Sequence, residues 1–346
     1  MKYRLLGRTG LYVSELCMGT MTFGGASGMW KIIGGLDQTA STALVKQAFD
    51  AGVNFFDTAN VYGFGAAETI TGAAIKQLGL PRDELVIATK AYGIMKEKVV
   101  NAGGQSRYHL MHQLDASLKR LQLDHVDLYQ LHGYDPLTPL DEVLETLNDM
   151  VRSGKVRYIG LCNMAAWQIM KGLGISDKRN LARFESVQAY YTVAGRDLER
   201  EVVPLLQDQQ LGLMVWSPLA GGLLSGKFKA DGTGPDGSRR ASFDFPLVDK
   251  ERAFRCVGVM QGIAERHGAT VPQVALAWLL DRPSVTTVIM GAKTPAQLAD
   301  NLGAVKVRLD DDAIQALDAV SALPQEYPGW MLKRQGDPRR APPSRD

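Results

Sequence analysis

The chain has 346 residues, of which 45% are hydrophobic and 22% are charged, and its formal net charge is +2. This composition is typical of a globular protein with a large apolar core, and it excludes a chain that is disordered over most of its length. Because Lys and Arg are scattered along the sequence, it also argues against nucleic acid and membrane as partners and favours a small molecule.

The cysteines and the N-terminal segment indicate the compartment. Cys17, Cys162 and Cys256 lie far apart and are odd in number, which fits neither a disulfide framework nor a paired zinc motif. The opening segment lacks the apolar core of roughly 7 to 15 residues that a secretion signal needs, and no apolar run approaches the roughly 20 residues of a membrane helix. We therefore expect a cytoplasmic protein.

The first predicted element is a short hairpin, with strands near residues 3–6 and 12–16 around a turn at 7–10. After it, short apolar runs alternate with amphipathic helical patterns. The runs that read as buried strands are 16–18, 53–56, 85–88, 126–129, 156–159, 184–187, 213–215 and 287–289. Because parallel strands are usually joined by crossover helices, this alternation predicts a parallel sheet, and eight such units predict a closed (β/α)8 TIM barrel.

An open, doubly wound sheet is the alternative architecture. Such a sheet usually carries a glycine fingerprint after its first strand, and residues 16–20 lack one. The barrel is therefore favoured, as a single domain over residues 1–323. Residues 324–346 are rich in proline and are expected to form an irregular tail.

Three helices carry recognisable start signals. Ser106 and Thr138 each precede an amphipathic pattern and are expected to cap its first turn. Thr294-Pro295-Ala296-Gln297 has the pattern of a capping box that opens the last barrel helix.

Two insertions interrupt the alternation. Residues 24–35 are glycine-rich and follow the first barrel strand, and residues 219–247 form a long polar segment after the seventh. In a barrel both would lie on the C-terminal face, where active sites form, so both are candidate lids.

Polar or stacking side chains end most of the predicted strands. In chain order they are Asp57, Lys90, His132, Asn163, Gln188 and Trp216. Any one of these side chains could equally be polar only because the chain leaves the core for solvent at that point. Together they predict one functional rim.

Tyr62 follows Asp57 by five residues, so a loop can turn its phenol back over the rim beside Lys90. A nearby ammonium stabilises a phenolate, so we expect the pKa of Tyr62 to fall below its usual value of about 10. Asp57 would keep Lys90 charged and oriented. His132 could then donate a hydrogen bond to a substrate oxygen, which suits a site that protonates a developing alkoxide.

These motifs resemble those of a known family. The Asp, Tyr, Lys and His motifs of the aldo-keto reductase superfamily are similar, in the same order, to Phe56-Asp57-Thr58-Ala59-Asn60-Val61-Tyr62-Gly63, Ala88-Thr89-Lys90 and Leu131-His132-Gly133. The likeness extends from residues 6–10 through Asn301, which is nearly the whole chain.

The resemblance implies an NADP(H)-dependent oxidoreductase that interconverts a small carbonyl compound and its alcohol. Asp57, Tyr62, Lys90 and His132 would be the catalytic residues, with Tyr62 as the proton donor. The cofactor-binding residues implied by the resemblance are Gly19, Thr20, Met21, Asp57, Cys162, Asn163, Gln188, Trp216, Ser217, Pro218, Leu219, Gly221, Lys227, Gly291, Lys293, Gln297 and Asn301.

Several of these positions have a specific implied role. Asn163 and Gln188 match residues that bind the cofactor carboxamide, whereas Cys162 stands where the family usually has Ser and would weaken one hydrogen bond. Trp216 is similar to the aromatic residue that stacks on the nicotinamide ring. Lys293 stands at a helix N-terminus that attracts phosphate, which favours NADP(H) over NAD(H).

Two glycine-rich stretches imitate other nucleotide motifs. In residues 63–68, Glu68 takes the last small-residue position of a dinucleotide fingerprint and would repel a pyrophosphate. Residues 221–227 fit most of a P-loop, but Phe228 replaces the hydroxyl residue that binds magnesium. We reject both readings, and the second stretch is expected near the cofactor by family likeness.

The substrate itself is not specified. Trp30, Tyr62, Tyr92 and His132 are the expected substrate-binding residues, and Tyr191, Tyr327 and Trp330 either line the same pocket or pack elsewhere. We expect no metal, because His109 and His112 have no third ligand nearby and read as solvated helix residues.

Two questions of function stay open. The main alternative to an enzyme is an NADPH-binding regulatory subunit with weak catalysis, like channel β subunits, although no long N-terminal extension precedes the predicted barrel. A homo-oligomer also stays open.

Overall fold

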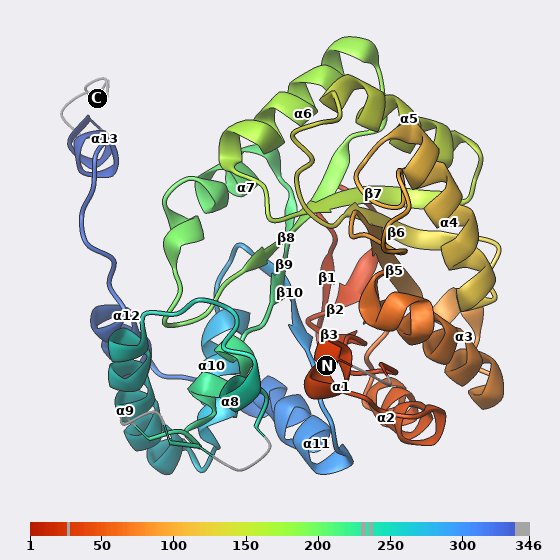
Figure 1. The fold of residues 1–346 in the computed structure, drawn as a ribbon. Helices are drawn as coiled ribbons and strands as arrows, with labels where there is room; N and C mark the ends of the chain where they lie inside the picture. The colour runs from red at the N-terminus through yellow and green to blue at the C-terminus, as the bar shows by residue number, and fades with distance from the viewer. Residues whose placement is uncertain (26–27, 230–232, 235–237, 336–346) are drawn as a thin grey trace.

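The computed structural model describes residues 1–25, 28–229, 233–234 and 238–335. Its centre is a closed barrel of parallel strands in the order β10-β3-β4-β5-β6-β7-β8-β9 (Figure 1). The strands are β3 (Leu16–Gly19), β4 (Phe55–Asp57), β5 (Val86–Ala91), β6 (Val126–Leu131), β7 (Val156–Cys162), β8 (Phe184–Tyr190), β9 (Gly212–Trp216) and β10 (Val285–Met290). The predicted (β/α)8 barrel is confirmed, and the open sheet is excluded.

The helices follow the chain around the outside of the barrel (Figure 1). They are α2 (Gln38–Asp50), α3 (Ala66–Leu78), α4 (Arg107–Leu121), α5 (Leu140–Arg152), α6 (Ala166–Arg179), α7 (Val202–Gln209), α9 (Lys250–His267), α10 (Val271–Leu280), α11 (Pro295–Gly303) and α12 (Asp311–Val320). Short 3-10 turns are η1 (Tyr62–Gly65), η2 (Arg82–Glu84), η3 (Asp197–Glu199), η4 (Ala220–Ser225) and η5 (Ala304–Lys306).

Successive side chains of each strand point to opposite faces of the sheet, so the core has two apolar clusters. Outward-facing side chains such as Leu16 and Ile87 pack against the helices, whereas inward-facing side chains such as Cys17 and Val86 fill the barrel interior. Near the C-terminal ends of the strands, the inward positions change from apolar to polar. The barrel therefore presents a polar layer above an apolar base.

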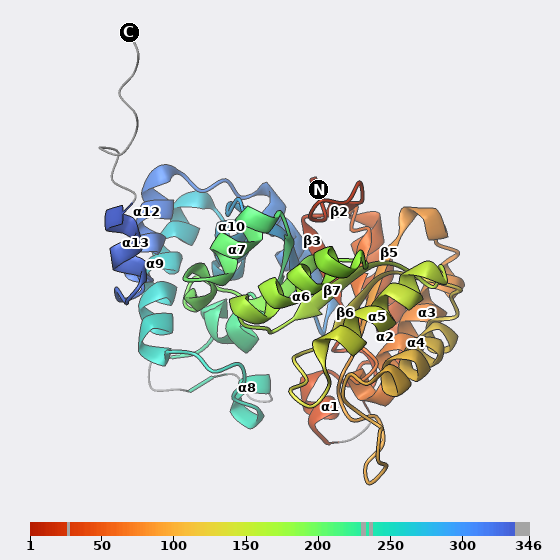
Figure 2. The ribbon, with the colours of Figure 1, turned by 90° about the horizontal axis from the view of Figure 1, so that it is seen from above.

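The predicted hairpin closes the base of the barrel. Its strands β1 (Tyr3–Leu5) and β2 (Tyr12–Ser14) pair antiparallel, and Leu6 and Val13 join the interior apolar cluster. Figure 2 shows the hairpin at one end of the barrel and α1 (Gly28–Ile33) and α8 (Arg239–Ser242) at the other. The polar layer therefore lies at the end that is away from the hairpin.

The helix starts test the predicted caps. Ser106 accepts a hydrogen bond from the His109 N–H, so its prediction is confirmed. The Thr138 prediction is wrong: α5 begins after Pro139, and the Thr138 hydroxyl instead donates to Asp135 at 2.7 Å. A charged carboxylate is a strong acceptor for a hydroxyl, which favours this contact with Asp135.

The predicted capping box at residues 294–297 is only half formed. The Thr294 hydroxyl accepts from the Gln297 N–H at 3.2 Å, as expected. The Gln297 side chain, however, accepts from the Lys293 N–H at 2.9 Å instead of from the N–H of Thr294. The backbone N–H of Lys293 is therefore bonded within the protein.

Three segments outside the alternation of strands and helices contain helical turns or helices. The first insertion carries α1, and the second carries η4 and α8; α1 and α8 contact each other across the C-terminal face. The tail also contains α13 (Gly329–Gln335), which Figure 1 shows outside the ring of barrel helices. The prediction of a wholly irregular tail is wrong, because residues 329–335 hold no proline that would break a helix. No helix in the described parts of the chain is both long and apolar enough to span a membrane.

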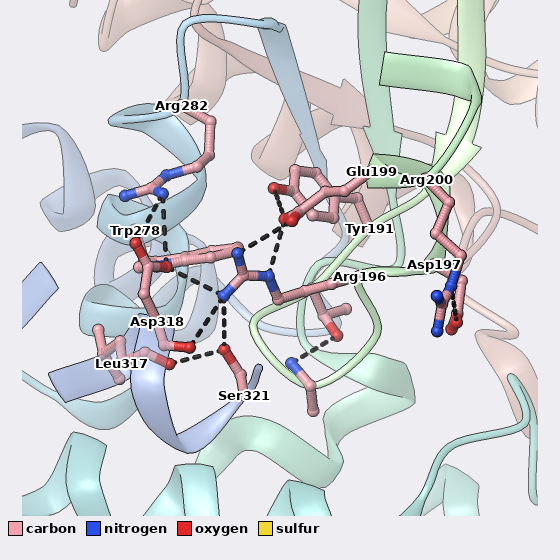
Figure 3. Close-up of polar contacts among 12 residues, drawn as sticks. Tyr191, Arg196, Asp197, Glu199, Arg200, Trp278, Arg282, Leu317, Asp318 and Ser321 are labelled. Atoms are coloured by element: carbon pink, nitrogen blue, oxygen red, sulfur yellow. Dashed lines mark hydrogen bonds and ion pairs between the residues drawn. The ribbon is translucent and has the colours of Figure 1, made fainter. Parts of the chain in front are cut away.

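A polar cluster fixes α12 to the rest of the barrel (Figure 3). Arg196 donates to Asp318 at 3.1 Å, and Arg282 pairs with the same carboxylate at 3.2 Å. Both guanidinium groups lie over the ring of Trp278, at 5.3 and 4.6 Å from its centroid, and its indole N–H donates to Asp318 at 3.0 Å. Asp318 therefore joins two arginines, each of which also pairs with a second carboxylate: Glu199 for Arg196 and Asp281 for Arg282.

Replacing Asp318 with Asn is expected to lower the free energy of unfolding by about 1 to 3 kcal/mol, because two largely buried guanidinium groups lose the carboxylate that they share and each keeps only its second partner, Glu199 or Asp281. The range lies below that of a fully buried pair because Asp318 is about one-third exposed (34%). Urea unfolding measures the change. Asp177→Asn, an exposed change of the same kind on α6, should stay within about 0.5 kcal/mol of the unsubstituted protein. Equal stability of the two variants would contradict the assignment.

Candidate active site

Most of the predicted site residues meet at the C-terminal end of the barrel. Asp57 and Trp216 end their strands, whereas Lys90 and Gln188 lie inside strands rather than after them. His132 and Asn163 follow β6 and β7 directly. All of these strands are parallel, so their C-terminal ends form one rim.

Asp57 and Lys90 form a buried ion pair in the polar layer. The side chains of Lys90 and Asp57 are 0% and 3% exposed, and the Lys90 ammonium donates to Asp57 Oδ2 at 2.5 Å and to the Thr58 carbonyl at 2.8 Å. Burial alone would lower the pKa of Lys90, but the negative charge of Asp57 outweighs it and raises that pKa above its usual value. Lys90 therefore remains a cation at neutral pH.

Tyr62 lies beside this cation, as predicted. The Lys90 Nζ atom is 5.1 Å from the centroid of the Tyr62 ring. The expected direction of the phenol pKa, however, is wrong. Burial raises the pKa of Tyr62 above its usual value, and the Lys90 ammonium offsets only part of that rise. The phenol therefore keeps its proton at neutral pH.

The local chain explains how Tyr62 reaches this position. The chain turns sharply through η1, where Gly63 and Gly65 have φ angles of 57° and 96°. A Cβ atom at Gly65 would lie 2.6 Å from Arg120 Cδ, so glycine is required there. The turn starts α3 directly, and Glu68 in its first turn is anchored by Arg120 and Thr89. The buried Glu68 carboxylate thus holds the loop that carries Tyr62. Because this carboxylate is a buried negative group, the segment is not suited to bind a phosphate.

His132 completes the group above the ion pair. Its ring packs edge-on against Tyr62, with 5.6 Å between the ring centroids. Burial and the nearby Lys90 ammonium lower the pKa of His132 to about 3. A neutral imidazole can donate one hydrogen bond without carrying charge, as the sequence analysis expected.

Amide side chains surround the free oxygen of Asp57. Gln130 donates to Asp57 Oδ1 at 2.9 Å, and Gln188 donates to the same atom at 3.2 Å. The Gln188 amide nitrogen also donates to Gln130 Oε1 at 3.3 Å. Both contacts of the Gln188 side chain are made by its amide nitrogen. Among the described residues, no protein group donates a hydrogen bond to its carbonyl Oε1.

Asn163 has the opposite orientation. Its carbonyl Oδ1 accepts from the Trp216 indole N–H at 2.9 Å. An indole is a donor only, so the Asn163 amide nitrogen is left as a donor. Asn163 and Gln188 therefore offer one N–H donor and one carbonyl acceptor on the same rim. That pattern is complementary to a primary carboxamide.

Cys162 lies at the end of β7 within this network. Its thiol is buried and contacts Gln130 Oε1 at 3.9 Å, and burial raises the pKa of the thiol. The thiol is therefore neutral and donates only weakly. Its contact lies within the protein, with Gln130.

The remaining rim residues implied by the resemblance adjoin the ion pair. Gly19 ends β3 in register with Asp57, and the Thr20 N–H donates to the Asp57 carbonyl at 3.0 Å; half-buried Met21 follows. The Ser217 hydroxyl accepts from the Gly221 N–H at 3.0 Å and so closes the turn that contains Pro218 and Leu219. Lys227, at the end of that loop, is exposed.

A second group of predicted residues lies at the start of α11. Lys293 Nζ donates to the Ile32 carbonyl of α1 at 3.0 Å, and Asn301 donates to the Gly291 carbonyl at 3.3 Å. Gln297 completes the group through its contact with the Lys293 N–H. This group is separate from the ion pair, and it joins the last barrel helix to the first insertion.

Two of the expected substrate-binding aromatic residues lie close to Tyr62 and His132. Trp30 on α1 packs against Tyr62, with 5.8 Å between centroids. Tyr92 is half-buried and lies against Gly133, next to His132. Together with Tyr62 and His132, they form an aromatic wall at the mouth of the barrel.

Three other aromatic residues do not line this wall. Tyr191 is buried against Trp278, and its hydroxyl donates to Glu199 at 2.6 Å. Tyr327 and Trp330 lie on the tail segment, exposed and packed against each other. These three belong to packing: Tyr191, directly after β8, packs against Trp278 of α10, and the tail carries Tyr327 and Trp330 to the outside of the ring of barrel helices.

The histidines of α4 also differ from expectation in one respect. His112 is exposed as predicted, but His109 is only 1% exposed, and its Nδ1 atom contacts the Asn101 carbonyl at 3.1 Å. The solvated reading of His109 is therefore wrong, because the loop before α4 folds over it. Within the described ranges, no group of three or more His, Cys, Asp or Glu side chains could hold a metal ion.

Sequence reasoning missed three residues at the site. Gln130 bonds Asp57 inside the barrel, Phe64 packs near Trp30 with 6.4 Å between centroids, and Phe245 stacks on Trp216 at 5.8 Å. Gln130 was detectable, because it has the same inward parity as Leu128 and His132 in an apolar strand. Phe245 comes from the second insertion, and no local pattern indicates its partner.

Comparisons with known proteins agree with this arrangement. A family model described as Aldo/keto reductase family matches residues 15–322. The chain is 39% identical over 329 residues to the uncharacterized oxidoreductase YrpG of Bacillus subtilis, covering 92% of this chain and 96% of that protein. It is 37% identical to a putative voltage-gated potassium channel subunit beta of Schizosaccharomyces pombe, covering 92% of each. It is 30% identical to the versiconal hemiacetal acetate reductase of Aspergillus parasiticus, covering 95% of this chain and 99% of that protein.

Proposed function

Because the chain belongs to the aldo/keto reductase family, we propose that it is an NADP(H)-dependent enzyme that reduces an aldehyde or ketone to an alcohol, with Tyr62 as the proton donor. The observation that carries this proposal is the convergence of Tyr62 and His132 above the buried Asp57–Lys90 pair. These groups supply a proton and stabilise negative charge at one place, which is what carbonyl reduction requires.

The residues of the rim fit a nicotinamide cofactor. Asn163 presents an amide donor and Gln188 a carbonyl acceptor, and the carboxamide of nicotinamide needs one of each. Trp216 adds an aromatic ring beside Asn163. When bound, the reduced cofactor supplies the hydride for the carbonyl carbon.

The protein's own groups then handle the oxygen of the substrate. The Tyr62 hydroxyl donates its proton to the carbonyl oxygen as negative charge develops there. Lys90, held as a cation by Asp57, stabilises the phenolate that Tyr62 becomes. Neutral His132 donates a hydrogen bond to the same oxygen and orients it.

The electrostatics set the protonation state of the proposed proton donor. Burial keeps the pKa of Tyr62 above its usual value, so the phenol is protonated before the reaction starts. Alcohol oxidation would instead need a phenolate as the base. The resting protein therefore has the protonation state that the reductive step needs.

The test is oxidation of NADPH in the presence of a panel of aldehydes and ketones, followed by the absorbance of the reduced cofactor. We expect turnover in the range of roughly 1 to 1,000 per second for the best substrate. Binding of NADPH with negligible turnover on every carbonyl would instead support a regulatory subunit. That alternative is motivated by the 37% identity to a protein named as a potassium channel β subunit.

The preference for NADP(H) over NAD(H) makes a separate prediction about Lys293, whose ammonium lies at the start of α11. Replacing Lys293 with Gln should weaken NADPH binding about tenfold and leave NADH binding nearly unchanged, because only NADPH carries the extra phosphate. Fluorescence titration of both cofactors measures this. Lys306→Gln, which removes an exposed charge from η5, is the matched control and should change neither affinity. Equal weakening for both cofactors by the Lys293 change would contradict the assignment.

A further inference from the structure

Gln130 is a buried amide near the C-terminal end of β6. It is 0% exposed and lies on β6 between Tyr129 and Leu131, which point outward into the apolar core. Burying an amide is unfavourable unless its polar atoms are bonded. Both ends of the Gln130 amide are bonded, so the residue has a defined place in the polar layer.

The bonds of Gln130 allow only one orientation of its amide. Its nitrogen donates to Asp57 Oδ1 at 2.9 Å, and its oxygen accepts from Gln188 Nε2 at 3.3 Å and from the Cys162 thiol at 3.9 Å. Reversing the amide would place its oxygen against the Asp57 carboxylate and its nitrogen against two donors. Every contact would then be repulsive.

This orientation determines that of Gln188. The Gln188 nitrogen has two acceptors inside the barrel, Asp57 Oδ1 and Gln130 Oε1. Asp57 alone would hold the Gln188 nitrogen by a single contact of 3.2 Å, and the second acceptor engages its other hydrogen. The Gln188 carbonyl is thereby directed away from both.

We propose that Gln130 is a positioning residue that links the Asp57–Lys90 pair to Gln188 and fixes Gln188 as an acceptor for the cofactor carboxamide. This inference rests on the proposed function, because it needs a nicotinamide cofactor at Gln188. Gln130 touches neither substrate nor cofactor in this role. It acts through the two side chains that do the binding and the charge stabilisation.

The test is a double-mutant cycle on the binding of NADP⁺, measured by quenching of tryptophan fluorescence without turnover. Gln130→Met keeps the length of the side chain and removes its amide, and Gln188→Met does the same one strand away. Each single change should raise the Kd about tenfold, the effect of one lost hydrogen bond. In the Gln188→Met background, Gln130→Met should change the Kd by less than about twofold, because the residue through which it acts is gone.

Independent action of the two residues would instead multiply their effects to about 100-fold, and that result overturns the inference. An unchanged Kd in the Gln130→Met protein overturns it too. If the wild-type protein binds neither NADP⁺ nor NAD⁺, the proposed function fails and the inference fails with it. The wild-type titration thus separates the two failures.

Tyr129→Phe is the matched control for loss of folding. It lies on the same strand, next to Gln130, and removes a hydroxyl that donates to the Leu110 carbonyl at 3.4 Å on the outer side of the barrel. It lowers stability without touching the polar layer. Its Kd for NADP⁺ should equal that of the wild type. A higher Kd would mean that any loss of packing weakens binding, and this result would overturn the inference.

Gln130→Glu should make the Kd for NADP⁺ depend on pH in a way that a merely structural role of Gln130 would not. A protonated Glu side chain can donate to Asp57 and accept from Gln188 as Gln130 does, whereas an ionised one repels Asp57. The charged and titratable groups around this position are Asp57 on β4, Lys90 on β5, Cys162 on β7, Cys17 on β3, and Tyr62 and His132 above. Relative to the wild type at the same pH, the Kd should be nearly normal at low pH and about tenfold higher at high pH. A pH-independent ratio would count against the role, and this variant stays informative if Gln130→Met fails to fold.

Discussion

Replacing Tyr62 with Phe is expected to lower kcat for carbonyl reduction by about 10²- to 10⁴-fold, the usual contribution of a positioned general acid. The substitution removes only the hydroxyl, so the contacts of the ring with Trp30 and His132 remain. The affinity for NADPH should change by less than about twofold. Steady-state kinetics and a cofactor titration on the same preparation measure both quantities.

The pH dependence of the wild-type enzyme follows from the same group. The pKa of Tyr62 is raised by burial, so the phenol stays protonated across neutral pH, and the rate of reduction should be flat there and fall only at alkaline pH. His132, with a pKa of about 3, is neutral over the same range and adds no inflection to the pH profile.

Tyr129→Phe is the matched control for Tyr62→Phe, because it removes a buried tyrosine hydroxyl away from the site and should retain activity. Normal turnover by the Tyr62 variant would show that the proton comes from elsewhere.

Replacing Lys90 with Met should both abolish most activity and destabilise the fold. The Asp57 carboxylate would remain buried with only the amides of Gln130 and Gln188 as partners. Breaking a buried pair in this way typically lowers the free energy of unfolding by about 3 to 5 kcal/mol. Urea unfolding at neutral pH measures the loss.

The stability that Lys90 contributes depends on pH. Its pKa is raised in the folded protein, so its contribution to stability is fully present below the unfolded value of about 10.4 and is lost as the pH rises through the folded value. The stability difference between wild type and Lys90→Met should therefore be constant from neutral to mildly alkaline pH.

The double variant Asp57→Asn, Lys90→Met separates stability from activity. It removes both charges, so it should recover most of the stability that Lys90→Met loses and none of the activity. A Lys90→Met protein as stable as the wild type would contradict the buried ion pair. Recovery of activity in the double variant would contradict the role of the ammonium beside Tyr62.

Much of the fold could be predicted from the sequence because it depends on local patterns. The period of the apolar residues indicates strands and helices, and the alternation of the two indicates a parallel barrel. Polar residues such as Asp57 and Asn163 at strand ends then identify one rim, since all strands run in the same direction. Ser106 shows that a cap can also be read locally, whereas Thr138 shows how a nearby carboxylate, here Asp135, redirects a hydroxyl.

The electrostatics of the site were decided by the tertiary structure alone. The sequence places Tyr62 and Lys90 on adjacent segments, which suggests a lowered phenol pKa, but the degree of burial is set by the whole barrel and reverses the direction. The orientations of Asn163 and Gln188 depend on Trp216, Gln130 and Asp57, which come from other strands. Sequence patterns record which residues neighbour one another along the chain, whereas desolvation and hydrogen-bond direction depend on groups brought together across it, and so only the closed barrel determines them.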